Sequence, residues 1–330
     1  MPLTMIYCIG IDGGGTKTEG VLTDRDGHVL ARLKYGASNP NDIGFDASVC
    51  LLVDMIRDLL QAGGNIPAEN VSVFAGIAGA LAHREALCAA IRKEIPSLGA
   101  LSVDSDVINL LSAATPSGQG ICLICGTGSV CFARKNNTVT RIGGWGYLLD
   151  DAGGGYDIGR MALSVALKAY DGRADKDDAL PLTEALTQHY QKPPQELIPD
   201  IYANGKPYIA SCAPVVFRLA RQGDALSERI LQINAEALAA CLATACMHFP
   251  NENTIPVILG GSINVKESPM WSDRIKNALP PTVASAMELH ILQAPPVFGA
   301  LAEALRAPGM YDEKTAFHQF QSEFLATYLS

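Results

Sequence analysis

The sequence predicts an α/β protein of two domains. The chain has 330 residues, which is more than a single hydrophobic core usually serves. Two segments also begin alike, each with an apolar strand, a glycine-rich elbow and a second strand. Gly13 in the first elbow and Gly126 in the second are 113 positions apart, with the same order of elements around them. Length and internal similarity together indicate two related domains.

The first domain alternates strands and helices. Hydrophobic periodicity and turn residues predict the following order: a hairpin sheet over 5–34, a helix over about 45–62, a strand over 71–77, a helix over 83–93, a strand over 100–103 and a helix over 107–114. Pro116, Ser117 and Gly118 then break the pattern just before the second elbow. We place the domain boundary there and expect a hinge at the same point.

The second domain repeats this beginning and then becomes largely helical. Strands are predicted over 120–125, 130–135 and 138–142, helices over 154–248, a strand over 256–259, a helix near 266–278, a strand near 286–292 and a helix from Val297. The tail 313–328 carries phenylalanines at helical spacing, which is typical of a helix docked on a core. We therefore predict one domain over 1–116 together with a C-terminal helix of about 312–330, and a second over 117–311.

Composition excludes several classes of protein. The chain is 48% hydrophobic and 18% charged, as in a well-buried globular protein. Its net charge of −9 argues against a nucleic-acid partner. The most apolar long stretch, 237–249, is too short to cross a bilayer, and the first residues lack the basic region of a signal peptide. Nine scattered cysteines fit a reducing compartment, so we expect a cytoplasmic protein with no membrane partner.

The two elbows predict a nucleotide site. Runs of glycine remove the side chains that would hold the backbone away from an anion, and neighbouring hydroxyls and N–H groups then act as donors. A P-loop fits less well, because Thr16 stands at the position of its lysine and a strand follows in place of a helix. Two such elbows suggest two clamps on one polyphosphate. The candidate residues are Gly13, Gly14, Gly15, Thr16, Lys17 and Thr18 in the first elbow, and Gly126, Thr127, Gly128 and Ser129 in the second.

A third glycine-rich motif covers 143–159 and reads Gly-Gly-Trp-Gly-Tyr-Leu-Leu-Asp-Asp-Ala-Gly-Gly-Gly-Tyr-Asp-Ile-Gly. Through this motif and the two elbows, the chain resembles the BadF/BadG/BcrA/BcrD ATPase family, and within it the N-acetylglucosamine kinases. The resemblance implies two ribonuclease H-like domains of the actin type, each with a five-stranded sheet opening on a β-hairpin, and an interdomain cleft. It implies ATP and Mg²⁺ as cofactors and phosphorylation of a hydroxyl, on C6, of an amino sugar such as N-acetylglucosamine or glucosamine. For such an enzyme we expect a homodimer.

The resemblance also implies roles for single residues. Asp12 would hold Mg²⁺ through water, and the pair Gly260 and Gly261 would lie on the adenosine side. The general base should be a carboxylate near the end of the strand that comes before the second hairpin sheet, where Asp104 and Asp106 compete. Counting back along the following helix places the family's aspartate on Asp106.

Sugar recognition would use both domains. Asn39 of the first matches the family's sugar-binding asparagine. The second would contribute Gly144, Trp145, Gly146 and Asp151. Trp145 would either wall the sugar or merely pack. Because substrate contacts come from both sides, we expect sugar binding to close the domains.

The block around Asp151 departs from the family pattern Gly-Asp-Glu-Gly. Asp150 replaces the first glycine and Ala152 replaces the glutamate. This departure leaves the acceptor sugar open among N-acetylglucosamine, glucosamine, N-acetylmuramic acid and a plain hexose.

Other functions remain as alternatives. An activator ATPase of an iron–sulfur dehydratase or reductase would need cysteine ligands, and no suitable pair stands out in the sequence. A sugar-sensing repressor of the ROK type would need an N-terminal helix-turn-helix, whereas this chain begins with a strand.

Overall fold

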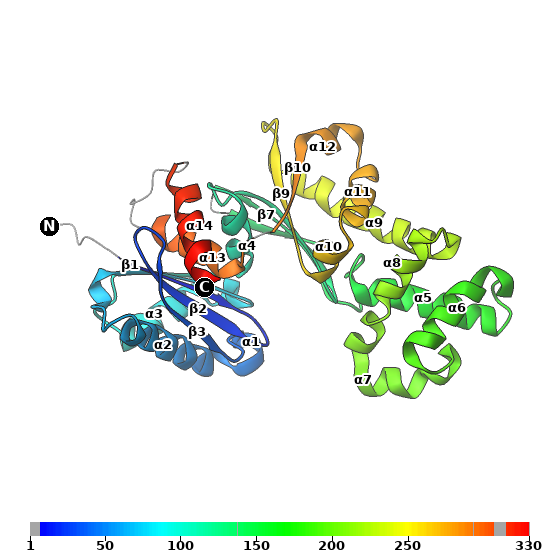
Figure 1. Ribbon diagram of the computed structural model, residues 1–330, viewed down its shortest axis with the longest axis horizontal. Helices are drawn as coiled ribbons and strands as arrows, with labels where there is room; N and C mark the ends of the chain where they lie inside the picture. The colour runs from blue at the N-terminus through cyan, green and yellow to red at the C-terminus, as the bar shows by residue number, and fades with distance from the viewer. Residues whose placement is uncertain (1–6, 137, 293, 307–314, 330) are drawn as a thin grey trace. The chain divides into compact units, whose positions relative to one another are not determined.

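The computed structural model describes residues 7–136, 138–292, 294–306 and 315–329, with the side chains of residues 315 and 316 excepted. The chain forms two compact units, drawn in Figure 1. Unit 1 comprises Met1–Gln119 and Leu292–Ser330, and unit 2 comprises Gly120–Ile291. No helix in the described part of the chain is both long and apolar enough to cross a membrane.

Unit 1 contains a five-stranded sheet in the order β3-β2-β1-β4-β5. Antiparallel pairing joins the first three strands, and β4 and β5 run parallel to β1. The carboxyl ends of the three parallel strands therefore meet at one edge, the usual position for a ligand in such sheets. The strands are β1 (Tyr7–Gly13), β2 (Thr18–Asp24), β3 (Val29–Tyr35), β4 (Val71–Ile77) and β5 (Ala100–Asp104).

Helices cover both faces of this sheet. Figure 1 shows α2 and α3 on one face and α13 and α14 on the other. Helix α13 and strand β1 pack closely because Gly10 has no side chain: a Cβ there would overlap the backbone of Leu301. The helices are α1 (Pro40–Ile43), α2 (Phe45–Ala62), α3 (Arg84–Glu94), α4 (Val107–Ala114), α13 (Pro296–Arg306) and α14 (Thr315–Tyr328), with 3₁₀ turns η1 (Ala68–Asn70) and η2 (Ala80–Ala82).

The predicted C-terminal docking helix is present as α14. Its phenylalanines Phe317, Phe320 and Phe324 are buried, and their rings lie 5.2–5.9 Å from the ring of Phe298 in α13. Burial of large aromatic rings is a strong source of packing energy, so this cluster holds α14 on unit 1. The first part of the predicted range, 313–314, lies outside the described residues.

Unit 2 repeats the sheet topology of unit 1. Its strand order is β10-β9-β6-β7-β8, in which β6, β7, β8, β9 and β10 correspond to β1 through β5. The predicted fold class, two α/β domains that each open on a β-hairpin, is thereby confirmed. The strands are β6 (Gly120–Cys125), β7 (Ser129–Lys135), β8 (Thr138–Ile142), β9 (Ile255–Gly260) and β10 (Met287–Ile291).

Most of the helical mass of unit 2 lies between β8 and β9, as predicted. One hydrophobic core, which includes Trp271 and Phe217, joins these helices to the sheet. The helices are α5 (Gly155–Tyr170), α6 (Lys176–Tyr190), α7 (Ile198–Ala210), α8 (Ala213–Arg221), α9 (Ala225–Cys246), α10 (Ser262–Glu267), α11 (Met270–Asn277) and α12 (Pro281–Ala286), with the 3₁₀ turn η3 (Pro194–Glu196).

Two details differ from the sequence-based expectation. The single helix expected over 266–278 is two helices, because Pro269 cannot donate a backbone hydrogen bond and α10 ends before it. Unit 2 ends at Ile291, where the prediction extended the second domain to 311. The reason is that α13 packs on α4 and β1, so that its buried side belongs to unit 1.

Candidate functional site

The first elbow is a tight loop at the end of β1 whose carbonyl groups are already bound. Gly14 N donates to Lys17 O at 2.9 Å and closes the loop, and Ala78 N donates to Gly13 O at 2.8 Å. Gly13 has no room for a side chain, since a Cβ would overlap Ser38 and Ile77. Gly15, Thr16 and Lys17 are exposed at the tip. Because the carbonyl groups of Gly13 and Lys17 already accept backbone hydrogen bonds, the exposed tip is the candidate place for an anion.

The second elbow is also a tight loop between two antiparallel strands, one residue shorter than the first. Gly126 N donates to Gly128 O at 2.9 Å, and the first turn of α5 binds the elbow through Gly155 N to Gly126 O at 2.8 Å and Tyr156 N to Thr127 O at 2.9 Å. Thr127 is exposed at the tip. Both predicted phosphate clamps are thus tight loops with an exposed tip, at the end of the first strand of their sheets.

Two of the predicted phosphate ligands have another role. The hydroxyl of Thr18 donates to Gly36 O at 2.7 Å, and that of Ser129 donates to Ala152 O at 2.6 Å. Both side chains are buried and come at corresponding positions, just after their elbows. Their hydroxyls hold the hairpins in shape, so we assign the anion contacts to the loop tips.

A cavity of about 190 Å³ opens beside the second elbow, entirely within unit 2. Its wall combines elbow backbone, apolar side chains and the first turn of α10. The predicted Gly260 and Gly261 lie just before this turn, and Gly261 passes so close to Cys125 that a Cβ would overlap its backbone. Lining residues include Gly126, Thr127, Pro207, Phe217, Ser262 and Lys266. The sequence indicated the elbow side of this cavity and missed the side made by α7, α8 and α10.

Asp12 lies at the end of β1, where the parallel strands of unit 1 meet. Its Oδ1 accepts a hydrogen bond of 2.7 Å from Asn109 Nδ2. The pKa of Asp12 is raised to about 6: burial is the main cause, the carboxylates Asp106 and Glu19 add to it, and Asn109 and Lys17 oppose it. A concentration of buried negative charge suits a cation, and Mg²⁺ in phosphotransfer sites takes one or two carboxylates together with the substrate's phosphates. The residues present therefore fit Mg²⁺.

Two buried asparagines, which the sequence analysis missed, lock the strand ends that carry the elbows. Asn109 Nδ2, in α4, lies 3.4 Å from Ile11 O and 3.1 Å from Gly76 O, which joins β1 to β4. Asn264 Nδ2, in α10, lies 2.8 Å from Leu123 O and from Gly260 O, which joins the corresponding strands β6 and β9. A polar residue within an apolar helical run was the available sequence signal.

The two candidate bases, Asp104 and Asp106, have different surroundings. Asp104 Oδ1 accepts from Ser105 N at 2.7 Å, and its Oδ2 lies 3.7 Å from Arg84. Asp106, at the start of α4, accepts a bond of 3.2 Å from the Ser105 hydroxyl. Burial raises the pKa of Asp106, while the Ser105 hydroxyl and the Val107 N–H lower it. Asp104 is thus part of a local ion pair, whereas Asp106 shares a negative environment with Asp12.

Asn39 lies beside the first elbow at the beginning of α1. Its side-chain oxygen accepts from Asn41 N at 3.0 Å, and its amide donates to Asp42 Oδ2 at 2.8 Å. A Cβ on Gly15 would lie 3.0 Å from the same Asp42 oxygen. Asn39, Asp12 and Asp106 are therefore all held around the carboxyl edge of the sheet of unit 1.

The predicted sugar residues of unit 2 gather around its elbow. Asp151 is 8% exposed, its Oδ1 accepts from Gly146 N at 3.1 Å, and its Oδ2 lies against Gly128. Gly144 is held against the backbone of Ser129. Trp145 is 61% exposed, with the Arg141 guanidinium 4.6 Å from its ring centre, so its ring is not part of the core.

The raised pKa of Asp106 predicts how activity depends on pH. A base must be ionised to accept a proton, so kcat/KM should fall as pH drops through this raised pKa. Ser105→Ala removes a hydrogen bond to the carboxylate and should move the acid limb to higher pH. The measurement compares the pH profiles of parent and variant with the same nucleotide, so that ionisation of ATP cancels. Identical acid limbs would exclude Asp106 as the titrating group.

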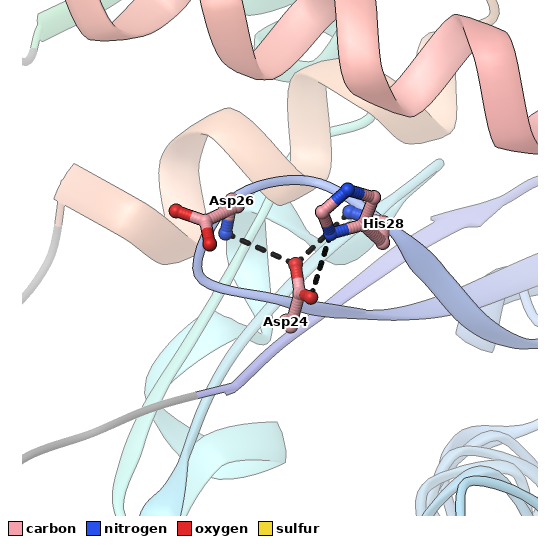
Figure 2. A group of neighbouring side chains, drawn as sticks. All are labelled: Asp24, Asp26 and His28. Carbon is pink, nitrogen blue, oxygen red and sulfur yellow. Dashed lines mark hydrogen bonds and ion pairs between the residues drawn. The ribbon is translucent and has the colours of Figure 1, made fainter.

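A separate cluster at the tip of the β2–β3 hairpin consists of Asp24, Asp26 and His28 (Figure 2). Within the described residues it is the only trio of possible ligands close enough for one metal ion. Asp24 Oδ1 accepts from the N–H groups of Asp26, Gly27 and His28, each at 3.0 Å, and its Oδ2 lies 2.8 Å from His28 Nδ1. The Asp24 carboxylate thus serves to cap the turn.

Comparison with known proteins identifies the family of this chain. Residues 9–304 match the sequence model of the BadF/BadG/BcrA/BcrD ATPase family, so the chain belongs to this family, and the resemblance is confirmed. An N-acetylmuramic acid/N-acetylglucosamine kinase of Clostridium acetobutylicum is 33% identical over 79% of this chain and 86% of its own. An N-acetyl-D-glucosamine kinase of Dictyostelium discoideum is 28% identical over 89% of this chain and 96% of its own.

A crystal structure from Chromobacterium violaceum, provisionally named an N-acetylglucosamine kinase, has a TM-score of 0.65 and 27% identity. The similarity covers 91% of this chain and 99% of that one. Both units therefore take part in the match.

Proposed function

We propose that this protein is an ATP-dependent sugar kinase that phosphorylates a hydroxyl, on C6, of an amino sugar such as N-acetylglucosamine or glucosamine. The observation that carries the proposal is the pair of glycine-rich elbows, one beside a cavity of about 190 Å³ and the other beside the carboxylates Asp12 and Asp106. The kinases among its relatives support the assignment.

ATP is assigned to unit 2. Its adenine would enter the cavity against Pro207 and Phe217, and its phosphates would reach the tip of the second elbow at Thr127. Backbone N–H groups at such a loop stabilise charge without having to reorganise during the reaction. The first elbow, with Lys17 exposed at its tip, is the second candidate phosphate clamp.

Asp106 acts as general base in this proposal. Its carboxylate accepts the proton of the sugar hydroxyl as the oxygen attacks the γ-phosphorus, and the bond from the γ-phosphorus to the bridging oxygen of ADP breaks. Asp12, held by Asn109, would hold Mg²⁺ through water. When bound, the ion neutralises charge on the phosphates. Since base and nucleotide belong to different units, the reaction requires both.

N-acetylmuramic acid is the second candidate acceptor. The Clostridium acetobutylicum relative is named for both sugars, and the replacement of the family's glutamate by Ala152 frees space next to Asp151. A single contact of this kind changes the ratio of kcat/KM for two sugars by only about 10–200-fold, so the acceptor has to be found by measurement.

The test is ADP release with Mg-ATP over a panel of N-acetylglucosamine, glucosamine, N-acetylmuramic acid, N-acetylmannosamine and glucose. We expect the highest kcat/KM for one of the first three, and mass spectrometry of its product should show one added phosphoryl group on C6. ATP consumption unaffected by every sugar would contradict the proposal.

A further inference from the structure

Lys206 lies where the nucleotide cavity and the sugar-binding candidate Asp151 meet. Its Nζ is 2.9 Å from Asp151 Oδ2 and 5.2 Å from the centre of the Tyr147 ring. A Cβ on Gly128 would lie 3.0 Å from the same nitrogen, so the ammonium also borders the second elbow. Neither the motif spacing in the sequence nor the family resemblance indicated Lys206 as a site residue.

The backbone explains how Lys206 reaches this position. Gly205, just before it, has φ 63° and ψ −149°, a conformation open to glycine alone among ordinary residues, and it breaks α7 there. Pro207, just after it, lines the nucleotide cavity, as do Ala210 and Ser211. The segment that delivers the lysine to Asp151 is therefore also a wall of the cavity.

Asp151 needs this cation. Its carboxylate is 8% exposed, and Gly146 N supplies its other hydrogen bond in the described structure, at 3.1 Å. A buried carboxylate without a positive partner is costly and tends to turn towards water. The ion pair with Lys206 and the bond from Gly146 N hold the Asp151 carboxylate in one position, where it can accept a hydrogen bond from a sugar hydroxyl.

We infer that Lys206 is a positioning residue that fixes Asp151 for the sugar and ties it to the wall of the nucleotide cavity. The inference rests on the proposed function, because it takes Asp151 as the sugar ligand. It adds a residue whose replacement should weaken the binding of the acceptor sugar more than the binding of ATP.

The experiment uses the full-length chain with Lys206→Met, Lys206→Arg and a matched control, Lys192→Met. Lys192 also forms an ion pair with a residue of α7, Asp200 at 2.7 Å, but far along the helix from the cavity lining and 50% exposed. KM for the sugar, kcat and the affinity for ATP without sugar are measured for each, with thermal unfolding as a check on folding.

Lys206→Met should raise the sugar KM about 10- to 100-fold, the effect of losing a hydrogen bond to a buried charge. ATP affinity should change by less than about threefold, since the cavity wall remains. Lys206→Arg keeps the charge and should recover most of the loss, and Lys192→Met should behave as the parent.

A double-mutant cycle gives the decisive comparison. If Lys206 acts through Asp151, adding Lys206→Met to Asp151→Asn should cause little further loss. Additive losses, a loss confined to ATP affinity, or equal behaviour of Lys206→Met and Lys192→Met would overturn the inference. A parent protein that phosphorylates none of the sugars would instead contradict the proposed function.

Discussion

Asp106→Asn should lower kcat by roughly 10²–10⁴, the range expected for loss of a positioned general base. The amide has the size of the carboxylate and can still accept a hydrogen bond from Ser105, so the fold around α4 should remain. ATP affinity should change little, because the cavity proposed for the nucleotide is lined by residues of unit 2 alone. ADP release at saturating sugar and calorimetric titration with ATP measure the two effects.

Asp104→Asn is the matched control for this prediction. Asp104 lies two residues earlier, but its oxygens are engaged with Ser105 N and, at 3.7 Å, with Arg84. Because Asp104 transfers no proton in the proposed reaction, Asp104→Asn should reduce kcat by less than about tenfold, well short of the loss of a positioned base. The opposite order, with Asp104→Asn inactive and Asp106→Asn active, would move the base to Asp104.

Local patterns predicted most of the fold. The helices α2 and α4 and the strands β4, β6 and β8 have the predicted bounds, because each joins a clear hydrophobic periodicity to a strong turn or cap. The similarity of the two elbows also predicted that the two domains have related sheets, and the two sheets do share one topology. These features depend on residues close in sequence.

Features that depend on distant contacts were not predictable in this way. Whether α13 belongs to one unit or the other is decided by close packing: a Cβ at Gly299 would overlap the backbone of Asn109 in α4. The links made by Asn109 and Asn264 join strands far apart in the chain. Lys206 reaches Asp151 across 55 positions, and only the break at Gly205 brings it there.

Asp12→Asn should reduce kcat by roughly 10²–10³ and weaken the dependence of activity on Mg²⁺. The carboxylate lies at the mouth of the first elbow, where negative charge is concentrated by burial and by neighbouring carboxylates. An amide keeps an oxygen for the bond from Asn109 Nδ2 but loses the charge that attracts the ion. Initial rates over a range of Mg²⁺ concentrations, with ATP affinity measured in parallel, test this.

Stability separates this functional role from a structural one. Asp12 is a partly buried carboxylate beside other carboxylates, an arrangement that costs folding free energy unless a cation is bound. Without Mg²⁺, Asp12→Asn should therefore unfold at the same temperature as the parent or a higher one, although it has lost activity. Asp26→Asn, at the exposed tip of the neighbouring hairpin, should match the parent in both activity and stability. If Asp12→Asn instead lowers the unfolding temperature and leaves the Mg²⁺ dependence of the remaining activity unchanged, Asp12 has a structural role and the ion is held elsewhere.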